Sequence, residues 1–404
     1  MASYIDGATM VSLGVAIVFF IPYFHLSSWM VGALVSGLQF AFAAGAAVGG
    51  RLGDLFGRRA VYTVDLLVYM AGVLVIILAP NSTVLFAGVI VTGLAMGADV
   101  PTSMALVFEE AEDGKRGSAV IFTQTLLLSG VIVTQLIGFA VADMDVLGGR
   151  LLFVHLFVVA LVVWLLRRGV GESEVWLRVA AHPEADARRN LRAVFQKRHV
   201  VAMTSTSLFF VFAAMAPNTT GQFSAFFITT LSGASTRTAT AVGLAAVIVG
   251  VLSSLLFQRY VDIPVGRRTL FVIGLATFVV GPLVPVAAGY SLWSVVAMLI
   301  LTSVGGTCAG EALYKVWTQE IFSTEIRSTT QGLTYGVSRC ATAGFALLTP
   351  SLVTNNPSVV MWVLSGLSVI AGVIGLVWIP RLPRHGDIGA APVPRTVTPQ
   401  ATAK

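Results

Sequence analysis

Long apolar windows separated by short polar stretches run through the whole chain. A helix needs about 20 apolar residues to cross the hydrocarbon core of a bilayer, and twelve windows approach or exceed that length. Their approximate limits are 4–22, 31–50, 60–79, 84–106, 118–141, 151–168, 200–230, 238–257, 269–288, 293–315, 330–352 and 358–380. The pattern predicts an all-α integral membrane protein with twelve transmembrane helices.

Two longer polar segments divide the chain into parts. We expect an N-terminal six-helix bundle over 1–168, a cytoplasmic linker over 169–199, a C-terminal six-helix bundle over 200–380 and a disordered cytoplasmic tail over 381–404, which is rich in Pro, Ala and Thr. The window 200–230 is long for one span and contains Pro217, Asn218 and Gly221. We therefore expect a broken helix there, which a membrane protein tolerates where the break lines a cavity or packs on protein.

The first window begins almost at the start of the sequence, with little before Tyr4. Either this helix is short or the natural chain begins upstream, and we favour the second explanation. No basic region precedes the apolar run, so a cleavable signal peptide is not predicted.

Composition and charge agree with a lipid environment. Of the 404 residues 56% are hydrophobic and 11% are charged, whereas soluble chains carry roughly a quarter charged residues. If the even-numbered windows end inside the cell, only Arg150 and Arg237 of the 25 Lys and Arg residues lie outside. Lys315 and Arg339 lie within windows, and the other 21 are cytoplasmic. The positive-inside rule then explains the net charge of +6 without nucleic acid. We expect a monomeric, multi-pass protein of the bacterial inner (plasma) membrane, surrounded by lipid, with both termini cytoplasmic.

Two charged motifs occur twice. GRLGDLFGRR at 50–59 follows the second window, and RYVDIPVGRR at 259–268 follows the eighth. Glu109 precedes Arg116 by seven positions, and Glu320 precedes Arg327 by the same interval. Both motifs recur in the same order about 210 positions later, which indicates duplication of a six-helix unit, as in transporters built from parallel repeats.

The charged residues of these motifs predict a gate on the cytoplasmic side. Arginines can pair with carboxylates there, and glycine permits tight turns and close helix approach. The alternative is that these residues only set the topology and cap helices. The predicted gate residues are Gly53, Asp54, Gly57, Arg58, Arg59, Glu109, Arg116, Asp262, Gly266, Arg267, Arg268, Glu320 and Arg327.

The repeated motifs together resemble the major facilitator superfamily, most closely its sugar porters, over residues 4–380. GESEVWL at 171–177 is similar to their Pro-Glu-Ser-x-x-Trp-Leu, and 311–332 is similar to bacterial myo-inositol transporters. The resemblance implies the major facilitator fold and alternating access. The chain departs from the pattern in one extra residue between Asp262 and Gly266, in the lack of Pro-Glu-Thr after the last window, and at Val89, where sugar porters have an arginine.

Two aspartates within the first six windows are candidates for proton coupling. An ionisable side chain inside a membrane is costly and is usually functional, and a carboxyl group in an apolar cavity can take up a proton near neutral pH. By resemblance, Asp6 matches the proton-binding aspartate of sugar porters, and Asp99 in GADVP (97–101) matches the Gly-x-Asp-Tyr-Pro element of phosphate and other metabolite symporters. The alternatives are a position of Asp6 at the helix mouth and a helix-bonding role of Asp99 in the kink at Pro101.

The predicted substrate site combines charged residues of the second half with neutral polar residues. Glu311 and Lys315 share one helical face, and by resemblance Gln124 stands where sugar porters keep a substrate-binding glutamine. Each residue could instead serve helix–helix bonding. The predicted substrate-binding residues are Gln124, Gln135, Asn218, Gln222, Glu311, Tyr314, Lys315, Trp317 and Arg339.

Together these features predict proton-coupled uptake of a polyol or sugar, with myo-inositol favoured. A proton symporter of small organic acid anions, with Lys315 and Arg339 as counter-charges, is the alternative. A non-transporting membrane sensor is the alternative from another class, but it would need a longer cytoplasmic domain than 169–199 or 381–404. The chain lacks a phosphate-binding Gly-x4-Gly-Lys loop, metal-ligand histidine spacing and a catalytic pair, so we expect no ATP, cofactor, metal or enzyme activity.

Overall fold

The computed structural model describes residues 2–112, 114–141, 144–167, 169, 171–174, 176–177, 194–234 and 236–383. Every regular element in these ranges is a helix. Ten of the described helical segments are long and apolar enough to cross a membrane. The predicted all-α membrane architecture is therefore confirmed. Most of the predicted linker (169–199) and tail (381–404) lies outside the described residues.

The described part of the first half forms six helices, and each predicted window lies within one of them, apart from at most one residue at its end. They are α1 (Ala2–Phe24), α2 (Ser28–Phe56), α3 (Arg58–Leu78), α4 (Ser82–Glu110), α5 (Arg116–Ala140) and α6 (Asp145–Arg167). Helices α2 and α4 begin after Ser27 and Asn81, whose side chains accept bonds from backbone N–H groups of the first turn. Gly57 alone separates α2 from α3, and its φ of 99° is a conformation that favours glycine.

The second half repeats this arrangement with two of its spans broken. Its elements are α10 (Lys197–Gln222), α11 (Ser224–Ser232), α12 (Thr236–Tyr260), α13 (Pro264–Ala288), α14 (Leu292–Ala309), α15 (Glu311–Ile321), α16 (Arg327–Asn355), α17 (Pro357–Val373), η2 (Ile374–Trp378) and η3 (Ile379–Arg381).

The positions of the two breaks correct the sequence-based expectation. Helix α10 continues through Pro217 and ends before Phe223, so Asn218 lies in its last turns and not in the break. The window 293–315 was expected to be one helix, but it is interrupted at Gly310. A window average does not detect this break, because a single glycine changes the mean hydropathy of the window very little. As a result Glu311 begins a new helix, α15.

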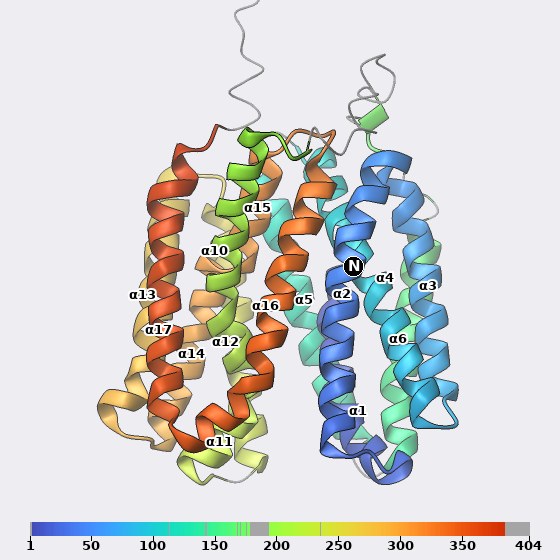
Figure 1. Cartoon of the computed structure of the whole chain (residues 1–404), viewed down its shortest axis with the longest axis vertical. Helices are drawn as coiled ribbons and strands as arrows, with labels where there is room; N and C mark the ends of the chain where they lie inside the picture. Colours follow the sequence, from blue (N-terminus) through green and yellow to red (C-terminus); the bar gives the residue numbers. More distant parts are fainter. Residues whose placement is uncertain are drawn as a thin grey trace, which may run out of the picture.

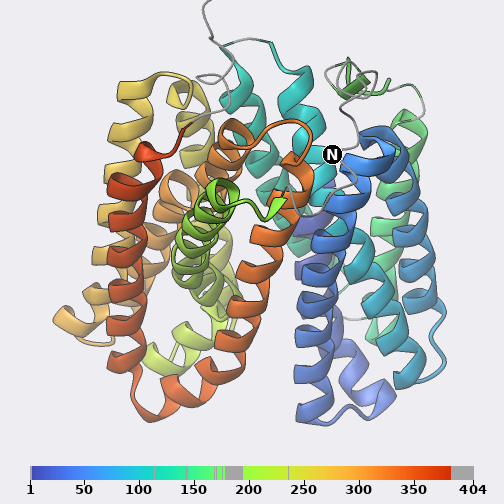
Figure 2. The same cartoon turned by 45° about the horizontal axis from the view of Figure 1, so that its top comes forward.

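The two halves stand side by side and meet along α2 with α16 and α5 with α12. Figures 1 and 2 show the first half in blue to teal and the second in green to red, with the halves converging at the top of Figure 1. Helices α2 and α16 approach so closely that a Cβ at Gly50 or Gly332 would collide with the backbone of the opposite helix.

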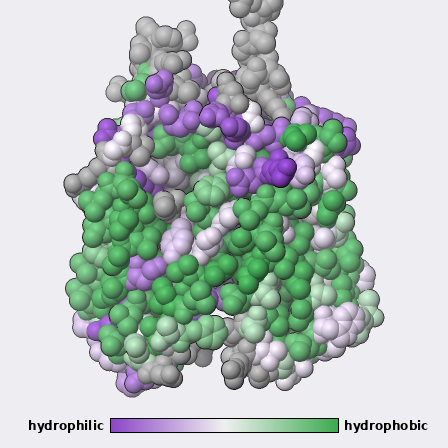
Figure 3. Space-filling view, turned by 180° about the vertical axis from the view of Figure 1, so that it is seen from behind, coloured by the Kyte–Doolittle hydropathy of each residue, from purple (hydrophilic) through white to green (hydrophobic). Residues whose placement is uncertain are grey.

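The surface is apolar around the middle of the molecule. Figure 3 shows hydrophobic side chains over the middle of one face and hydrophilic ones gathered at its top. Large apolar side chains such as Leu67, Val162 and Leu252 are exposed, which is the pattern expected against lipid and not against water. This protein is a multi-pass membrane protein. We call the end that carries the α2–α3, α4–α5, α12–α13 and α15–α16 connections the charged end.

Candidate transport site and gate

Buried ion pairs join the two halves at the charged end. The fully buried Arg58 lies 3.0 Å from Asp54 and 3.2 Å from Glu109. Glu109 also lies 3.0 Å from Arg327 of the second half. One carboxylate of α4 therefore binds an arginine from each half, as the predicted gate requires.

The two motif aspartates each cap a helix of the other half. Asp54 accepts bonds from the N–H of Ser328 (3.3 Å), the N–H of Thr329 (2.7 Å) and the Thr329 hydroxyl (2.6 Å), at the start of α16. Asp262 accepts bonds from the N–H groups of Gly117 and Ser118, both at 2.8 Å, at the start of α5. A carboxylate is stabilised by the N–H groups and dipole of a helix N-terminus. The pairing and capping alternatives are therefore combined here, and the caps cross the interface.

The remaining predicted gate residues have unequal surroundings. Arg267 binds Glu320 at 2.8 Å within the second half, and Arg116 lies 5.5 Å from the Phe108 ring. Arg59 and Arg268 are exposed. Gly53 packs so closely on Thr102 of α4 that a Cβ would have no room.

Gly266 does not occupy the position that Gly57 occupies. The extra residue of the second loop lets α13 begin at Pro264, so Gly266 lies inside its first turn instead of forming the connection. The site prediction also omitted Glu172, which accepts bonds from the N–H groups of Arg58 (3.0 Å) and Arg59 (3.1 Å) and thereby caps α3.

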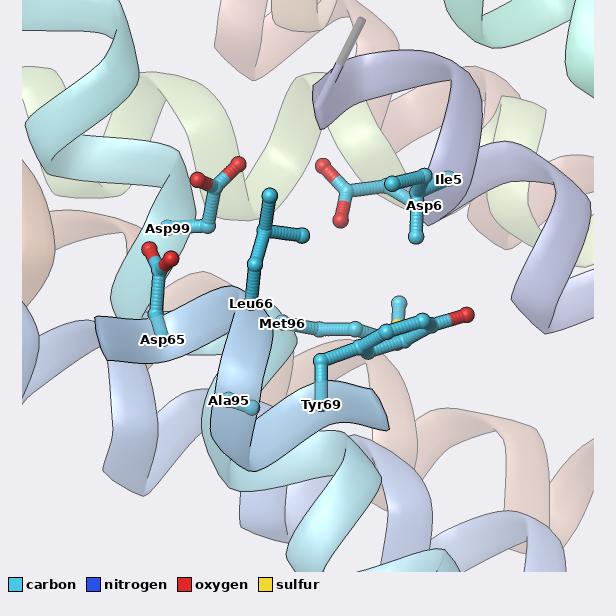
Figure 4. A pocket seen from close by; sticks show the side chains of 8 residues that line it. All are labelled: Ile5, Asp6, Asp65, Leu66, Tyr69, Ala95, Met96 and Asp99. Atoms are coloured by element: carbon cyan, nitrogen blue, oxygen red, sulfur yellow. The ribbon is translucent and has the colours of Figure 1, made fainter. Parts of the chain in front are cut away.

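In the interior of the first half, Asp6 and Asp99 line one small cavity. Asp6 is 6% exposed and Asp99 is 5% exposed. Figure 4 shows Asp6 of α1 pointing across the cavity toward Asp99 of α4. The other lining residues are Ile5, Asp65, Leu66, Tyr69, Ala95 and Met96. The space that the centre of a water molecule could occupy is about 10 Å³, which suits about one water molecule.

Two charged neighbours of this cavity were missed by the sequence analysis. Arg167, the last residue of α6, lies 3.0 Å from Asp99 and 3.4 Å from Asp65 of α3. Its guanidinium also lies over the Tyr62 ring, 3.3 Å from the ring centre. Asp65 and Arg167 both stand near the ends of their windows, where charges normally mark topology, so nothing in the local sequence indicated that they pair.

In the interior of the second half, Glu311 is the centre of a second charged group. It lies 2.8 Å from Lys315 and 3.2 Å from Arg339, and it accepts a 2.6 Å bond from the Tyr335 hydroxyl. Arg339 also donates to the Asn218 side chain at 3.4 Å. The structure thus confirms the Glu311–Lys315 pair and adds Arg339 to it. We call Glu311, Lys315 and Arg339 the second-half cluster.

The two charged interiors face each other across the molecule. Asp6 interacts electrostatically with Lys315, Glu311 and Arg339, in addition to Asp99. The Arg339 guanidinium lies 5.3 Å from the centre of the Phe42 ring of α2. Charged side chains of α1 and α15 are therefore close enough for the protonation of one half to influence the other.

The neutral polar candidates differ in burial, so they do not all lie in the interior. Gln124 is half-buried, and its side-chain oxygen is buried without a hydrogen-bond partner among the described residues. Gln135 is half-buried, whereas Gln222 is exposed at the end of α10. Among the predicted substrate-binding residues, Gln124 therefore has a buried acceptor that a ligand could use.

The two aromatic candidates lie in the packed core in this conformation. The Tyr314 ring stacks on Phe210 at 4.1 Å, and its hydroxyl is within 2.5 Å of Thr334. Trp317 packs edge-on against Phe209 and Phe271. Both are buried, so these rings support the shape of α15 here and do not line an open site.

Comparisons with known proteins agree with this architecture. A family model described as "Sugar (and other) transporter" matches residues 8–383. The minor myo-inositol transporter IolF of Bacillus subtilis (strain 168) is 28% identical over 394 residues, covering 94% of this chain and 89% of that protein. The glucose transporter GlcP of Staphylococcus epidermidis (strain ATCC 12228 / FDA PCI 1200) is 26% identical over 175 residues, or 43% of this chain and 39% of that protein.

Among solved structures, the proton:xylose symporter XylE of E. coli, bound to 6-bromo-6-deoxy-D-glucose, superposes with a TM-score of 0.83. The match covers 95% of this chain and 94% of that one at 18% sequence identity, and it shows the shared fold. The family match covers far more than half of the chain and includes both sets of motifs. The chain therefore belongs to the sugar (and other) transporter family, among the sugar porters of the major facilitator superfamily.

Proposed function

We propose that this protein is a secondary active transporter that takes up a polyol or sugar, with myo-inositol favoured, together with a proton. The observation that supports it is the pair of buried charged interiors, one in each half, that face each other inside a transporter fold. Ionisable groups at this depth are costly and are retained where they act on ions or substrate. Myo-inositol is favoured because IolF, a myo-inositol transporter, is similar over nearly the whole chain.

In this proposal the charged end faces the cytoplasm, as the placement of basic residues predicts. The Glu109–Arg327 pair and the caps formed by Asp54 and Asp262 hold the cytoplasmic side closed. Substrate then enters from outside, and these contacts break when the inner side opens. Because they join the halves through few atoms, they can separate as the halves rock about the central site.

A polyol presents several hydroxyl groups that both donate and accept hydrogen bonds. Gln124 offers a buried acceptor without a described partner. Glu311 and Lys315 in the first turns of α15, and Asn218 in the last turns of α10, offer further polar atoms. Binding would require Lys315 or Arg339 to loosen its contact with Glu311. A mixed donor and acceptor set suits a neutral polyol better than a single charge would.

The test is uptake of labelled myo-inositol, glucose and a dicarboxylate into proteoliposomes, with and without a proton gradient. Myo-inositol accumulation that disappears without the gradient supports the proposal. Accumulation without a gradient requirement contradicts proton coupling. The absence of flux for every solute would favour the sensor alternative, provided that a binding assay still detects a ligand.

A second candidate function is proton symport of small organic acid anions. It is favoured by the net positive charge of the second-half cluster, which contains two cations, Lys315 and Arg339, and one carboxylate, Glu311. Arg339 already donates hydrogen bonds to Glu311, Tyr335 and Asn218, which weakens this alternative. Dicarboxylate uptake driven by the gradient, without polyol uptake, would establish it instead.

A further inference from the structure

Three buried ionisable side chains of the first half include two acids but only one base. Asp65 (5% exposed), Asp99 (5%) and Arg167 (3%) come together from α3, α4 and α6. If both carboxyl groups are ionised, one negative charge is left without a partner where little water is present. Such a charge is strongly disfavoured, and a group in this position tends to neutralise instead.

The hydrogen bonding of Asp65 points to the same deficit. One of its side-chain oxygens, Oδ2, is buried and has no donor among the described residues. Its carboxyl group and that of Asp99 contact the same guanidinium group, that of Arg167, and Figure 4 shows it directed toward Asp99. An ionised carboxylate only accepts hydrogen bonds, so these two groups can bond to each other only if one of them holds a proton.

We propose that Asp65 and Asp99 share a single proton beside Arg167, and that this carboxyl pair is the proton-loading site of the transporter. With one proton, Asp65, Asp99 and Arg167 together carry no net charge. The protonated carboxyl group can then donate a hydrogen bond to the ionised one. This inference rests on the proposed proton coupling and specifies its chemistry. It assigns Asp65 as a proton carrier and Arg167 as a positioning residue, which the sequence analysis did not include.

The position of Arg167 explains how the site can work without the arginine expected in α4. Val89 is buried in the core of the first half and brings no charge. The cation comes instead from the end of α6, and its contact with the Tyr62 ring and a 2.5 Å bond to the Tyr62 backbone oxygen hold it in place. A fixed cation neutralises one carboxylate and leaves the second to be neutralised by a proton.

The charged and titratable groups around the pair define a route for the proton. Tyr62 faces it from α3, and Asp6 faces Asp99 from α1, with Tyr69 beside Asp6. Glu311, Lys315 and Arg339 act on Asp6 from the second half. The cavity between Asp6 and the pair has room for about one water and is too small for a sugar. A proton leaving the Asp65–Asp99 pair can pass through a water molecule in this cavity to the Asp6 carboxylate, which becomes neutral as the pair becomes charged.

The test follows the protonated carboxyl group directly by infrared spectroscopy of the purified full-length protein during a pH titration. An Asp6→Asn background removes the absorption of Asp6. In that background we expect a carboxylic C=O band that both Asp65→Asn and Asp99→Asn abolish, because each leaves one carboxylate paired with Arg167. Asp145→Asn, which changes an exposed aspartate at the start of α6, is the matched control and should leave the band unchanged.

Arg167 variants separate positioning from simple helix packing. Arg167→Gln should keep the band to higher pH, because two carboxyl groups then lack a counter-charge, and Arg167→Lys should return the titration toward that of the parent protein. A purely structural arginine would alter thermal stability without moving the titration. If the band remains in both Asp65→Asn and Asp99→Asn, the proposal is wrong. If one of these variants fails to fold, the band in the other still tests the proposal.

The infrared result is independent of substrate, so the two proposals fail separately. If the band behaves as expected but no polyol is accumulated, the proposed function is wrong and the shared proton stands. If myo-inositol accumulates with protons and Asp65→Asn changes neither the band nor the accumulation, the shared-proton site is wrong and the proposed function stands.

Discussion

The two halves of the molecule use matching residues at the charged end and different residues in the interior. Asp54 and Asp262 each cap a helix of the opposite half, and Arg58 and Arg267 each bind the glutamate of their own half. In the interior, the first half has three aspartates and one arginine around a small cavity. The second half has one glutamate between two cations.

This difference separates two tasks that a transporter must perform. The matching contacts at the charged end suit a motion that treats both halves alike, because rocking about a pseudo-twofold axis requires equivalent contacts on each side. The interiors do not need to be equivalent. An excess of acids suits proton binding, and a mixed set of donors and acceptors suits a polar solute.

The largest expected effect comes from Asp6→Asn in the first half. It removes the carboxylate that faces both Asp99 and the second-half cluster, so gradient-driven accumulation should fall to the equilibrium level while exchange of substrate across the membrane continues. Counterflow and accumulation in the same proteoliposomes measure both. Undiminished accumulation would show that Asp6 is not required for coupling, and Asp145→Asn serves as the control.

In the second half, Glu311→Gln should mainly destabilise the protein. It leaves Lys315 and Arg339 buried without their acid, and breaking a buried ion pair typically costs about 3–5 kcal/mol. Thermal unfolding in detergent should show a clear loss, which Glu311→Gln combined with Lys315→Met reduces. Asp6→Asn leaves no such pair of cations and should unfold near the parent temperature. Equal losses for both single variants would contradict the contrast between the interiors.

At the charged end, Asp54→Asn should open the molecule more than Asp262→Asn does. Asp54 is fully buried, has three donors at α16 and pairs with Arg58, whereas Asp262 is half-buried with two donors. Hydrogen bonds to a charged group contribute about 1.5–3 kcal/mol, so the closed population should fall about tenfold or more for Asp54→Asn.

Distances between spin labels at Glu112→Cys and Glu325→Cys, both exposed at the charged end, can measure that opening after Cys308 and Cys340 are replaced. A larger opening for Asp262→Asn would show that burial does not determine how strongly each cap holds the charged end closed.

The smallest effect is expected for the neutral side chains. Gln124→Ala removes a buried oxygen that has no described partner, so a lost hydrogen bond worth about 1 kcal/mol should weaken substrate binding about fivefold. Gln222→Ala changes an exposed residue of the second half and should have less effect. Isothermal titration with myo-inositol would compare them, and a stronger effect of Gln222→Ala would move the substrate site toward the end of α10.

The helices and the charged residues of the repeated loops were accessible from the sequence because they depend on local signals. Apolar length identifies each span, and the spacing of charges in the repeated loops identifies Asp54, Arg58 and Glu109 before any contact is known. The Glu311–Lys315 pair was also predictable, since residues four apart in a helix are neighbours. Gln222 and Trp317 show the limit, because both were chosen by resemblance to the substrate contacts of sugar porters and neither lines an enclosed site in this conformation.

The sequence by itself determined the membrane fold, the family and the two repeated charged motifs, because composition and spacing act over a few helical turns. Only the tertiary structure decided that Asp65 and Arg167 join Asp99, and that Asp54 and Asp262 cap helices across the interface. These contacts link residues that lie tens to hundreds of positions apart, and helix packing in three dimensions sets which of them meet. The repeated loops can therefore be recognised in the sequence. Asp65, Asp99 and Arg167 become partners only when α3, α4 and α6 pack together.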